Sequence, residues 1–242
     1  MYIHLARLHT VVAPKRFSEY LALLDREERN RLRRFHFERD RHLFAASHAF
    51  LRQTLSRYVK IPPDQLRFVV NRYGKPSLDC HSKEAVIHFN LSHTSDLVVV
   101  AVNADGEIGV DVERLDRNVD LLETGDLVFS REESADLRAT PPTGRLLRFF
   151  QYWTLKEAYL KAQGQGFSAA PNRFTVHFVP GGRAALSTVP EQEGNLDAWT
   201  LFHFEPDPEH VVAACAASPA GVAACRQGEF IADPNGLVEN DL

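Results

Sequence analysis

The sequence predicts an α+β protein. Residues 153–168 carry apolar side chains at helical spacing, and residues 97–113 hold two β-branched runs around an Asp-Gly pair, which predicts a hairpin. Beyond the helix, strand-like alternation recurs at 174–179, 199–204 and 211–216. Separate groups of helices and antiparallel strands are typical of α+β folds.

The other elements follow from the same criteria. In chain order we expect a strand at 2–8, helices at 17–24 and 44–58, and strands at 66–70 and 88–93. Ser130 followed by Glu133 has the pattern of a helix capping box, and the Pro-rich residues 139–144 predict a loop. Residues 219–242 show no clear periodicity, so we expect a partly irregular tail.

Composition narrows the class of protein. The chain has 242 residues, of which 44% are hydrophobic and 25% charged, as in a globular protein with one large domain or two small ones. Its net charge of −4 argues against a general nucleic-acid-binding protein, which is normally strongly basic. The first residues lack a signal-peptide pattern, and no apolar run has the length of a membrane span. We therefore expect a cytoplasmic protein that binds neither nucleic acid nor membrane.

The cysteines agree with a reducing compartment. Cys80, Cys215 and Cys225 are odd in number and widely spaced, without a Cys-x-x-Cys pair. This spacing predicts neither a disulfide framework nor a zinc site.

Two acidic patterns point to chemistry. Glu157 and Lys161 lie four residues apart in the predicted helix and so share one face, which is also common in ordinary solvated helices. In the strand after the Asp-Gly pair, a period of two places Asp111 and Glu113 on one face, with Gly109 just before them. Adjacent carboxylates repel each other, so a hard divalent cation is the simplest compensation.

Five ordered motifs carry a family resemblance. They are Tyr-Gly-Lys-Pro at 73–76, Asn-Leu-Ser-His at 90–93, Gly-Val-Asp-Val-Glu at 109–113, Trp-x-x-Lys-Glu-Ala-x-x-Lys at 153–161 and Gly-x-Gly-Phe-Ser at 164–168. In this order the chain resembles the surfactin-synthetase-type 4'-phosphopantetheinyl transferases. The resemblance implies a 4'-phosphopantetheinyl transferase fold of two similar α/β halves with pseudo-twofold symmetry and the active site at their seam. We place the halves at 1–107 and 108–218, followed by a tail at 219–242.

The resemblance implies an activity. Members of this family transfer the 4'-phosphopantetheine group of coenzyme A to a serine of an apo acyl or peptidyl carrier protein and release 3',5'-adenosine bisphosphate. They depend on Mg²⁺, with Mn²⁺ left open. The implied partners are coenzyme A and the carrier protein, and we expect a monomer. Carrier choice among fatty-acid, polyketide and nonribosomal-peptide biosynthesis stays open.

The resemblance also implies which side chains bind coenzyme A. The candidates for the 3'-phosphate are Arg31, Arg34 and Arg41. Many relatives have an arginine where this chain has Leu43, so the phosphate ligand is in doubt, and Arg41 is the preferred substitute.

Two further motifs contribute to the implied coenzyme A site. Gly74, Lys75 and Pro76 would shape the nucleotide pocket. Ser92 and His93 would hold phosphate oxygens.

The metal and catalytic roles follow in the same way. Asp111, Glu113 and Glu157 would bind one Mg²⁺, while Lys161 and His93 would offset charge on the phosphates. Glu157 is the candidate general base, either directly or through a metal-bound water. For Lys156, structural and phosphate-contacting roles are equally open.

Two other functions are considered. Clustered carboxylates with a lysine also serve metal-dependent phosphodiesterases. The broad basic surface expected for nucleic acid is missing, however, outside residues 25–42, which are rich in arginine. A non-catalytic module that binds carrier proteins is the third possibility, although every charged group required by the chemistry is present.

Overall fold

The computed structural model describes residues 1–8, 14–79, 87–116, 120–164, 170–179, 183–188, 198–217, 226–231 and 238–241. The helices are α1 Pro14–Leu23, α2 Arg26–Leu32, α3 Glu38–Val59, α4 Leu121–Val128, α5 Arg131–Ala139 and α6 Pro142–Gln163, with 3-10 turns at Pro63–Gln65 and Pro171–Arg173. The strands are β1 Tyr2–Arg7, β2 Phe68–Val70, β3 Pro76–Leu78, β4 His88–His93, β5 Leu97–Asn103, β6 Ile108–Arg114, β7 Phe174–Val179, β8 Arg183–Thr188, β9 Trp199–Asp207, β10 His210–Ala217, β11 Arg226–Ile231 and β12 Val238–Asp241.

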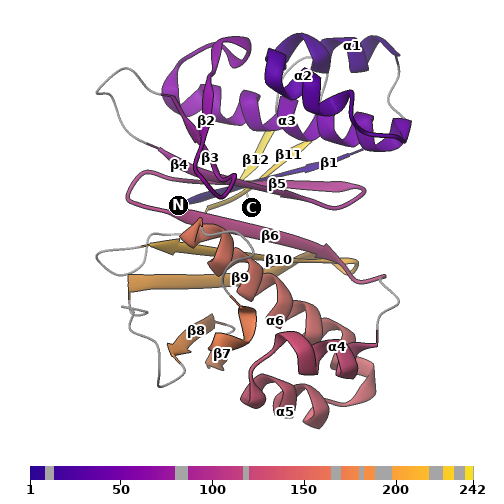
Figure 1. Ribbon diagram of the computed structural model, residues 1–242, viewed down its shortest axis with the longest axis vertical. Helices are drawn as coiled ribbons and strands as arrows, with labels where there is room; N and C mark the ends of the chain where they lie inside the picture. The colour runs from indigo at the N-terminus through magenta and orange to yellow at the C-terminus, as the bar shows by residue number, and fades with distance from the viewer. Residues whose placement is uncertain are drawn as a thin grey trace.

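Two five-stranded sheets form the middle of the molecule (Figure 1). The first has the order β12-β11-β1-β5-β4, and the second has the order β6-β10-β9-β8-β7. A small third sheet pairs β2 with β3. The tail expected to be partly irregular contributes β11 and β12, and β11 pairs in parallel with β1. The division into residues 1–107, 108–218 and 219–242 stays a prediction.

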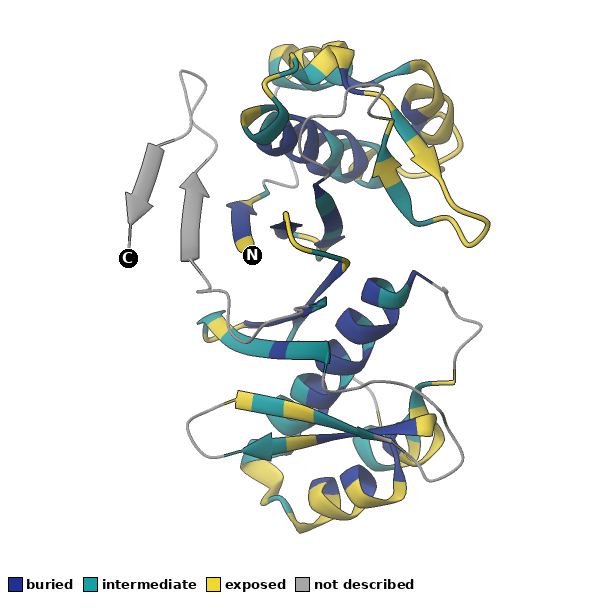
Figure 2. Cartoon of the chain, turned by 90° about the vertical axis from the view of Figure 1, so that its left-hand side faces the viewer, coloured by how far each residue is buried: buried dark blue, intermediate teal, exposed yellow. Residues whose placement is uncertain are grey.

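The layers follow from strand alternation. On β5, Val98, Val100 and Val102 pack with α3, while Leu97, Val99 and Ala101 pack against the second sheet. On β6, Ile108, Val110 and Val112 face the first sheet. On β10, Val211, Ala213 and Cys215 pack in the same core as α6. The order is therefore helix, sheet, sheet, helix, with buried residues concentrated between the layers (Figure 2).

The predicted hairpin around Asp105-Gly106 is wrong. β5 is buried along its whole length and pairs with β1 on one side and β4 on the other. β6 instead pairs antiparallel with β10 in the second sheet. The connection turns between the sheets, where the Asn103 side chain donates to the Gly106 carbonyl and the Ala217 amide donates to the Glu107 carbonyl. Two separate sheets bury both faces of β5, which a two-stranded hairpin would leave exposed.

At the helix ends, one sequence prediction is confirmed and another is partly wrong. The capping box at Ser130 and Glu133 is present, with reciprocal hydrogen bonds at the start of α5. Residues 139–144 are only partly a loop, because α6 already begins at Pro142, a position where the missing proline N–H costs no helical hydrogen bond. α6 ends at Gly164, whose φ of 63° lies in the left-handed region.

Two sequence expectations concern the whole chain. Within the described ranges, every helix is too short or too polar to cross a membrane. Cys215 is a buried free thiol, whereas Cys80 and Cys225 lie outside the described residues.

Candidate active site

Asp111 on β6 is the centre of a polar cluster that joins β4, β6 and α6. Its Oδ1 atom lies 2.6 Å from the ammonium of Lys161 on α6 and accepts a hydrogen bond of 3.0 Å from the Ser92 hydroxyl on β4. Lys161 also donates to the Ser92 oxygen at 3.2 Å. Three elements distant in sequence therefore place a carboxylate, an ammonium and a hydroxyl in mutual contact.

Glu157 extends this cluster by one helical turn. It is half-buried on α6, four residues before Lys161. Burial raises the pKa of Glu157, the negative charge of Asp111 raises it further, and Lys161 partly opposes both effects. The two carboxylates are thus close enough to repel each other, as expected for groups that would share a cation.

The donor chemistry of the side chains around Asp111 suits a divalent metal ion. The Oδ2 atom of Asp111 is buried without a hydrogen-bond partner, which is costly unless another group binds it. Glu113 is also buried and lies on the same face of β6 as Asp111. Together with Glu157, these side chains offer the hard oxygen ligands that Mg²⁺ and Mn²⁺ prefer.

A close backbone approach and a hydrogen bond bring the elements of the cluster together. A Cβ atom at Gly109 would lie 2.0 Å from the Ala158 carbonyl oxygen and 2.4 Å from the Ala162 amide nitrogen, so only glycine lets β6 approach α6 this closely. On the other side, the Val110 amide donates to the Asn90 side chain at 2.9 Å. This bond joins the edge of the second sheet to β4, two residues before Ser92.

His93 lies exposed at the end of β4. Partial burial of its ring lowers the pKa of His93, positive charges on His48 and Lys161 act in the same direction, and a hydrogen bond with the Thr94 backbone opposes them. The neutral form is therefore favoured while no anion is bound. A phosphate oxygen hydrogen-bonded to the ring would favour the charged form.

The Tyr-Gly-Lys-Pro motif forms a tight turn between β2 and β3. Gly74 has a φ of 90°, and Asn71 accepts hydrogen bonds from the Tyr73 and Lys75 amides. The Lys75 ammonium donates to Glu107 at 2.5 Å, to the Ile108 carbonyl at 3.1 Å and to the Ala162 carbonyl at 2.8 Å. Lys75 therefore fixes this turn to both β6 and the end of α6.

A cavity of about 210 Å³ lies between this turn and the N-terminal helices. Its lining includes Gly74 and Pro76 from the turn, Arg31 from α2, His48 from α3 and Asn90 from β4. Arg31 is exposed and lies 5.5 Å from the ring centre of Phe44. The structure thus brings three predicted nucleotide-binding residues to one cavity beside β4.

The other two arginines lie elsewhere. Arg34 is exposed just after α2, where its amide donates to the Arg31 carbonyl. Arg41 is half-buried in the first turn of α3, and its guanidinium donates to the Phe35 carbonyl at 3.1 Å. The roles of all three arginines toward a 3'-phosphate stay predictions.

Lys156 has a structural role. It is 2% exposed, and its ammonium lies 2.8 Å from Glu133 while donating to the carbonyls of Pro171 and Phe174. Burial lowers the pKa of Lys156 to about 8, against the opposing charge and hydrogen bond of Glu133. All three ammonium protons are used, so of the two roles left open the structural one holds.

Sequence reasoning gave no role to Asn90 and saw in Gly109 only the lack of a side chain. Asn90 carries a signal in retrospect, because the period of two puts it on the same face of β4 as Ser92. Predicted residues at 165–168 lie outside the described residues.

Comparison with known proteins identifies the family. A model of the N-terminal part of 4'-phosphopantetheinyl transferases matches residues 12–105, and a model of the 4'-phosphopantetheinyl transferase superfamily matches residues 107–215. The chain belongs to the 4'-phosphopantetheinyl transferase superfamily. Its two family matches meet between β5 and β6, where the chain passes from one sheet to the other.

Named relatives cover nearly the whole chain. The 4'-phosphopantetheinyl transferase HetI of Nostoc sp. is 35% identical over 219 residues, which is 90% of this chain and 89% of that protein. The 4'-phosphopantetheinyl transferase Sfp of Bacillus subtilis is 28% identical over 202 residues, or 84% of this chain and 86% of that protein.

A solved structure of a holo-(acyl-carrier-protein) synthase from Bacillus anthracis with coenzyme A aligns with 47% of this chain and 96% of its own, at 20% identity and a TM-score of 0.39. The family assignment rests on the sequence relatives.

Proposed function

We propose that this protein transfers the 4'-phosphopantetheine group of coenzyme A to a serine hydroxyl of an apo acyl or peptidyl carrier protein, releasing 3',5'-adenosine bisphosphate. The observation that carries the proposal is the contact of Asp111 with Lys161 and Ser92, beside Glu157, in a chain of this superfamily. Lys161 offers positive charge and Ser92 a hydroxyl beside Asp111, which supports the binding of a pyrophosphate at this cluster.

The reaction exchanges one phosphorus–oxygen bond for another. The serine oxygen of the carrier forms a bond to the β-phosphorus of coenzyme A, and the bond from that phosphorus to the bridging oxygen breaks. The serine proton passes to a base, and the adenosine bisphosphate leaves with the bond's electron pair. Catalysis then consists mainly of positioning and of offsetting charge on the phosphate oxygens.

A metal ion would be held by Asp111, Glu113 and Glu157. The buried, unpartnered Oδ2 atom of Asp111 supports this assignment. When bound, Mg²⁺ supplies Lewis-acid stabilisation of the pyrophosphate oxygens, and Mn²⁺ accepts the same oxygen ligands.

The protein's own groups do the remaining work. Glu157 is the candidate base for the serine proton, because a half-buried carboxylate at the edge of the cluster can face an incoming hydroxyl. The ammonium of Lys161 would offset charge that develops on the leaving group. His93, at the exposed end of β4, would donate a hydrogen bond to a phosphate oxygen. The buried Ser92 hydroxyl would do the same when it turns away from Asp111.

The nucleotide would extend from the cluster along β4 toward the N-terminal helices. Gly74 and Pro76 shape the wall of the cavity there, and Arg31 reaches it from α2. Lys75 would act by holding the turn in place. Arg34 and Arg41 are the further candidates for the 3'-phosphate, with Arg41 available if it leaves the Phe35 carbonyl.

We further propose coenzyme A and an apo carrier protein as the partners of a cytoplasmic monomer. The net charge of −4 supports the expectation that nucleic acid is not a partner. The monomer is supported by the candidate site, because Asp111, Lys161 and Ser92 all come from one chain.

The decisive experiment measures the intact mass of an apo carrier protein after incubation with this protein, coenzyme A and Mg²⁺, beside a sample with chelator. We expect a metal-dependent gain of one phosphopantetheine group. Coenzyme A binding without transfer to fatty-acid, polyketide or peptide carriers would indicate a non-catalytic carrier-binding module. Failure to bind coenzyme A would contradict the proposal and favour a metal-dependent phosphodiesterase.

A further inference from the structure

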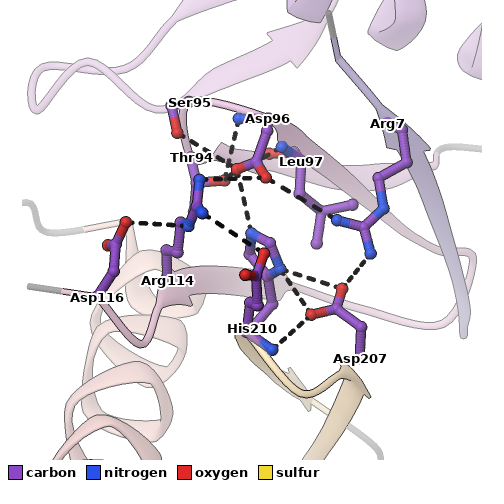
Figure 3. Close-up of polar contacts among 10 residues, drawn as sticks. Arg7, Thr94, Ser95, Asp96, Leu97, Arg114, Asp116, Asp207 and His210 are labelled. Atoms are coloured by element: carbon purple, nitrogen blue, oxygen red, sulfur yellow. Dashed lines mark hydrogen bonds and ion pairs between the residues drawn. The ribbon is translucent and has the colours of Figure 1, made fainter.

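A buried histidine connects the two halves at the end of the inter-sheet core. His210, the first residue of β10, is 0% exposed and lies between two carboxylates (Figure 3). Its Nδ1 atom is 2.9 Å from Asp207 in its own hairpin, and its Nε2 atom is 3.1 Å from Asp96 in the turn between β4 and β5. The imidazole therefore bridges the second sheet to the strand that ends in Ser92 and His93.

Arginines close the cluster around His210. Arg7 on β1 is paired with Asp207, and Arg114 on β6 lies 3.5 Å from Asp96 and 3.4 Å from Glu209. The spacing of Asp96, Glu209 and His210 could also suit a metal ion. The Arg114 guanidinium already lies against both carboxylates, however, so an arginine occupies the place of a cation beside them.

From Asp96, hydrogen bonds continue to the candidate active site. The Oδ1 atom that faces His210 also accepts from the Thr94 hydroxyl at 3.0 Å. The Thr94 hydroxyl accepts from the Leu97 amide at 3.1 Å, and the Thr94 amide donates to the Leu97 carbonyl at 2.8 Å. His93 is the last residue of β4 and directly precedes Thr94. The turn that follows His93 is thus held by a side chain from β10.

We propose that His210 is a positioning residue for coenzyme A binding. Through Asp96 and Thr94 it holds the turn that fixes the end of β4, where Ser92 and His93 lie. This inference rests on the proposed function, because it assumes that Ser92 and His93 contact the phosphates. His210 itself is buried and touches no substrate.

The position of His210 favours this role over simple packing. Both ring nitrogens of a buried imidazole need a hydrogen-bond partner. His210 has a carboxylate at each, and these come from segments 111 residues apart along the chain, so the ring joins β10 to the turn between β4 and β5. Asp207 is itself anchored by Arg7, so His210 is fixed on the side of the second sheet. The contact of its Nε2 atom with Asp96 then holds the turn between β4 and β5.

The test is the dissociation constant for coenzyme A, measured by calorimetry with Mg²⁺ well below the melting temperature. We expect His210→Ala to weaken binding roughly tenfold, which corresponds to about 1.4 kcal/mol. His210→Gln keeps an N–H that can reach Asp96 and should recover most of the affinity. Asp96→Ala breaks the same link from the other side, and the double variant should bind no more weakly than either single variant, because the effects share one path.

Leu137→Ala, a buried truncation on α5 far from this turn, is the matched control for loss of stability. It should lower the melting temperature without changing coenzyme A affinity. Unchanged affinity in both His210→Ala and Asp96→Ala, with a lowered melting temperature, would overturn the proposal; if His210→Ala does not fold, Asp96→Ala decides alone. Because affinity is the readout, a parent that binds coenzyme A but loads no carrier would contradict the proposed function and still leave this test valid.

Discussion

Gly109 of β6 lies so close beneath Ala158 of α6 that a single added carbon would come within 2.0 Å of the Ala158 carbonyl oxygen. Asp111 follows two residues later on the same face of the strand, and Glu157 precedes Ala158 on the helix. The close approach of strand and helix therefore sets the distance between the carboxylates of the candidate site.

Gly109→Ala should destabilise the fold and loosen the site together. The added methyl group must displace backbone atoms of α6, and overpacking typically costs about 1 to 3 kcal/mol, so we expect a loss near the upper end of this range. Urea unfolding should show the loss, and the remaining folded protein should bind Mg²⁺ more weakly. Gly144→Ala on the same helix is the control, since its Cβ would meet Thr140 at an ordinary 3.6 Å and alanine favours the helix. Equal stability of the two variants would refute the packing argument.

Local patterns predicted the parts of the site that depend on one element. The period of two in β6 placed Asp111 and Glu113 together, and the spacing of four in α6 placed Glu157 beside Lys161. Both follow from backbone geometry alone. The family resemblance implied that these elements come together in one active site, which the periodicity of a single element cannot predict.

Long-range pairing could not be predicted in this way. The Asp-Gly turn favoured a hairpin, but β6 pairs with β10, about a hundred residues further along, because that arrangement buries both faces of β5. The contact of His210 with Asp96 could not be predicted for the same reason. The two residues lie 114 positions apart, and no local pattern connects them. The contact of Lys156 with Glu133 likewise depends on how α5 and α6 pack.

Acid should destabilise the protein through His4 on β1. Burial lowers the pKa of His4 to about 4, and the charge of Arg57 acts in the same direction. Between pH 6.5 and 4 the unfolded chain therefore binds a proton that the folded protein does not, so stability falls as the pH falls through this window. His4→Gln should lose less stability than the parent between pH 7 and pH 4.5, by about 2 to 3 kcal/mol.

Denaturant unfolding at several pH values measures this difference. The exposed His36→Gln variant should follow the curve of the parent. A His4→Gln curve parallel to the parent would show that His4 does not resist protonation in the folded state.

The buried ion pair of Lys156 and Glu133 should behave as a structural unit. Lys156→Met leaves the Glu133 carboxylate buried without its partner, which typically costs about 3 to 5 kcal/mol. Adding Glu133→Gln removes that charge, and the double variant should recover part of the loss. A double-mutant cycle of unfolding free energies measures the coupling. Transfer by the folded fraction of Lys156→Met should stay near the parent rate; a specific loss of transfer at full stability would instead indicate contact with phosphate.

Glu157→Gln should abolish turnover while the fold stays intact. The amide is nearly isosteric, but it can neither accept the serine proton nor offer the same charge to a cation, so the transfer rate should fall by at least about 100-fold. Removing one of two repelling carboxylates should keep or raise the melting temperature, since burial and Asp111 both disfavour a charge at Glu157. Single-turnover mass measurements on a carrier protein, beside the exposed control Glu19→Gln, separate these effects. A Glu157→Gln rate close to that of the parent would remove Glu157 as the base and leave a metal-bound water as the acceptor of the serine proton.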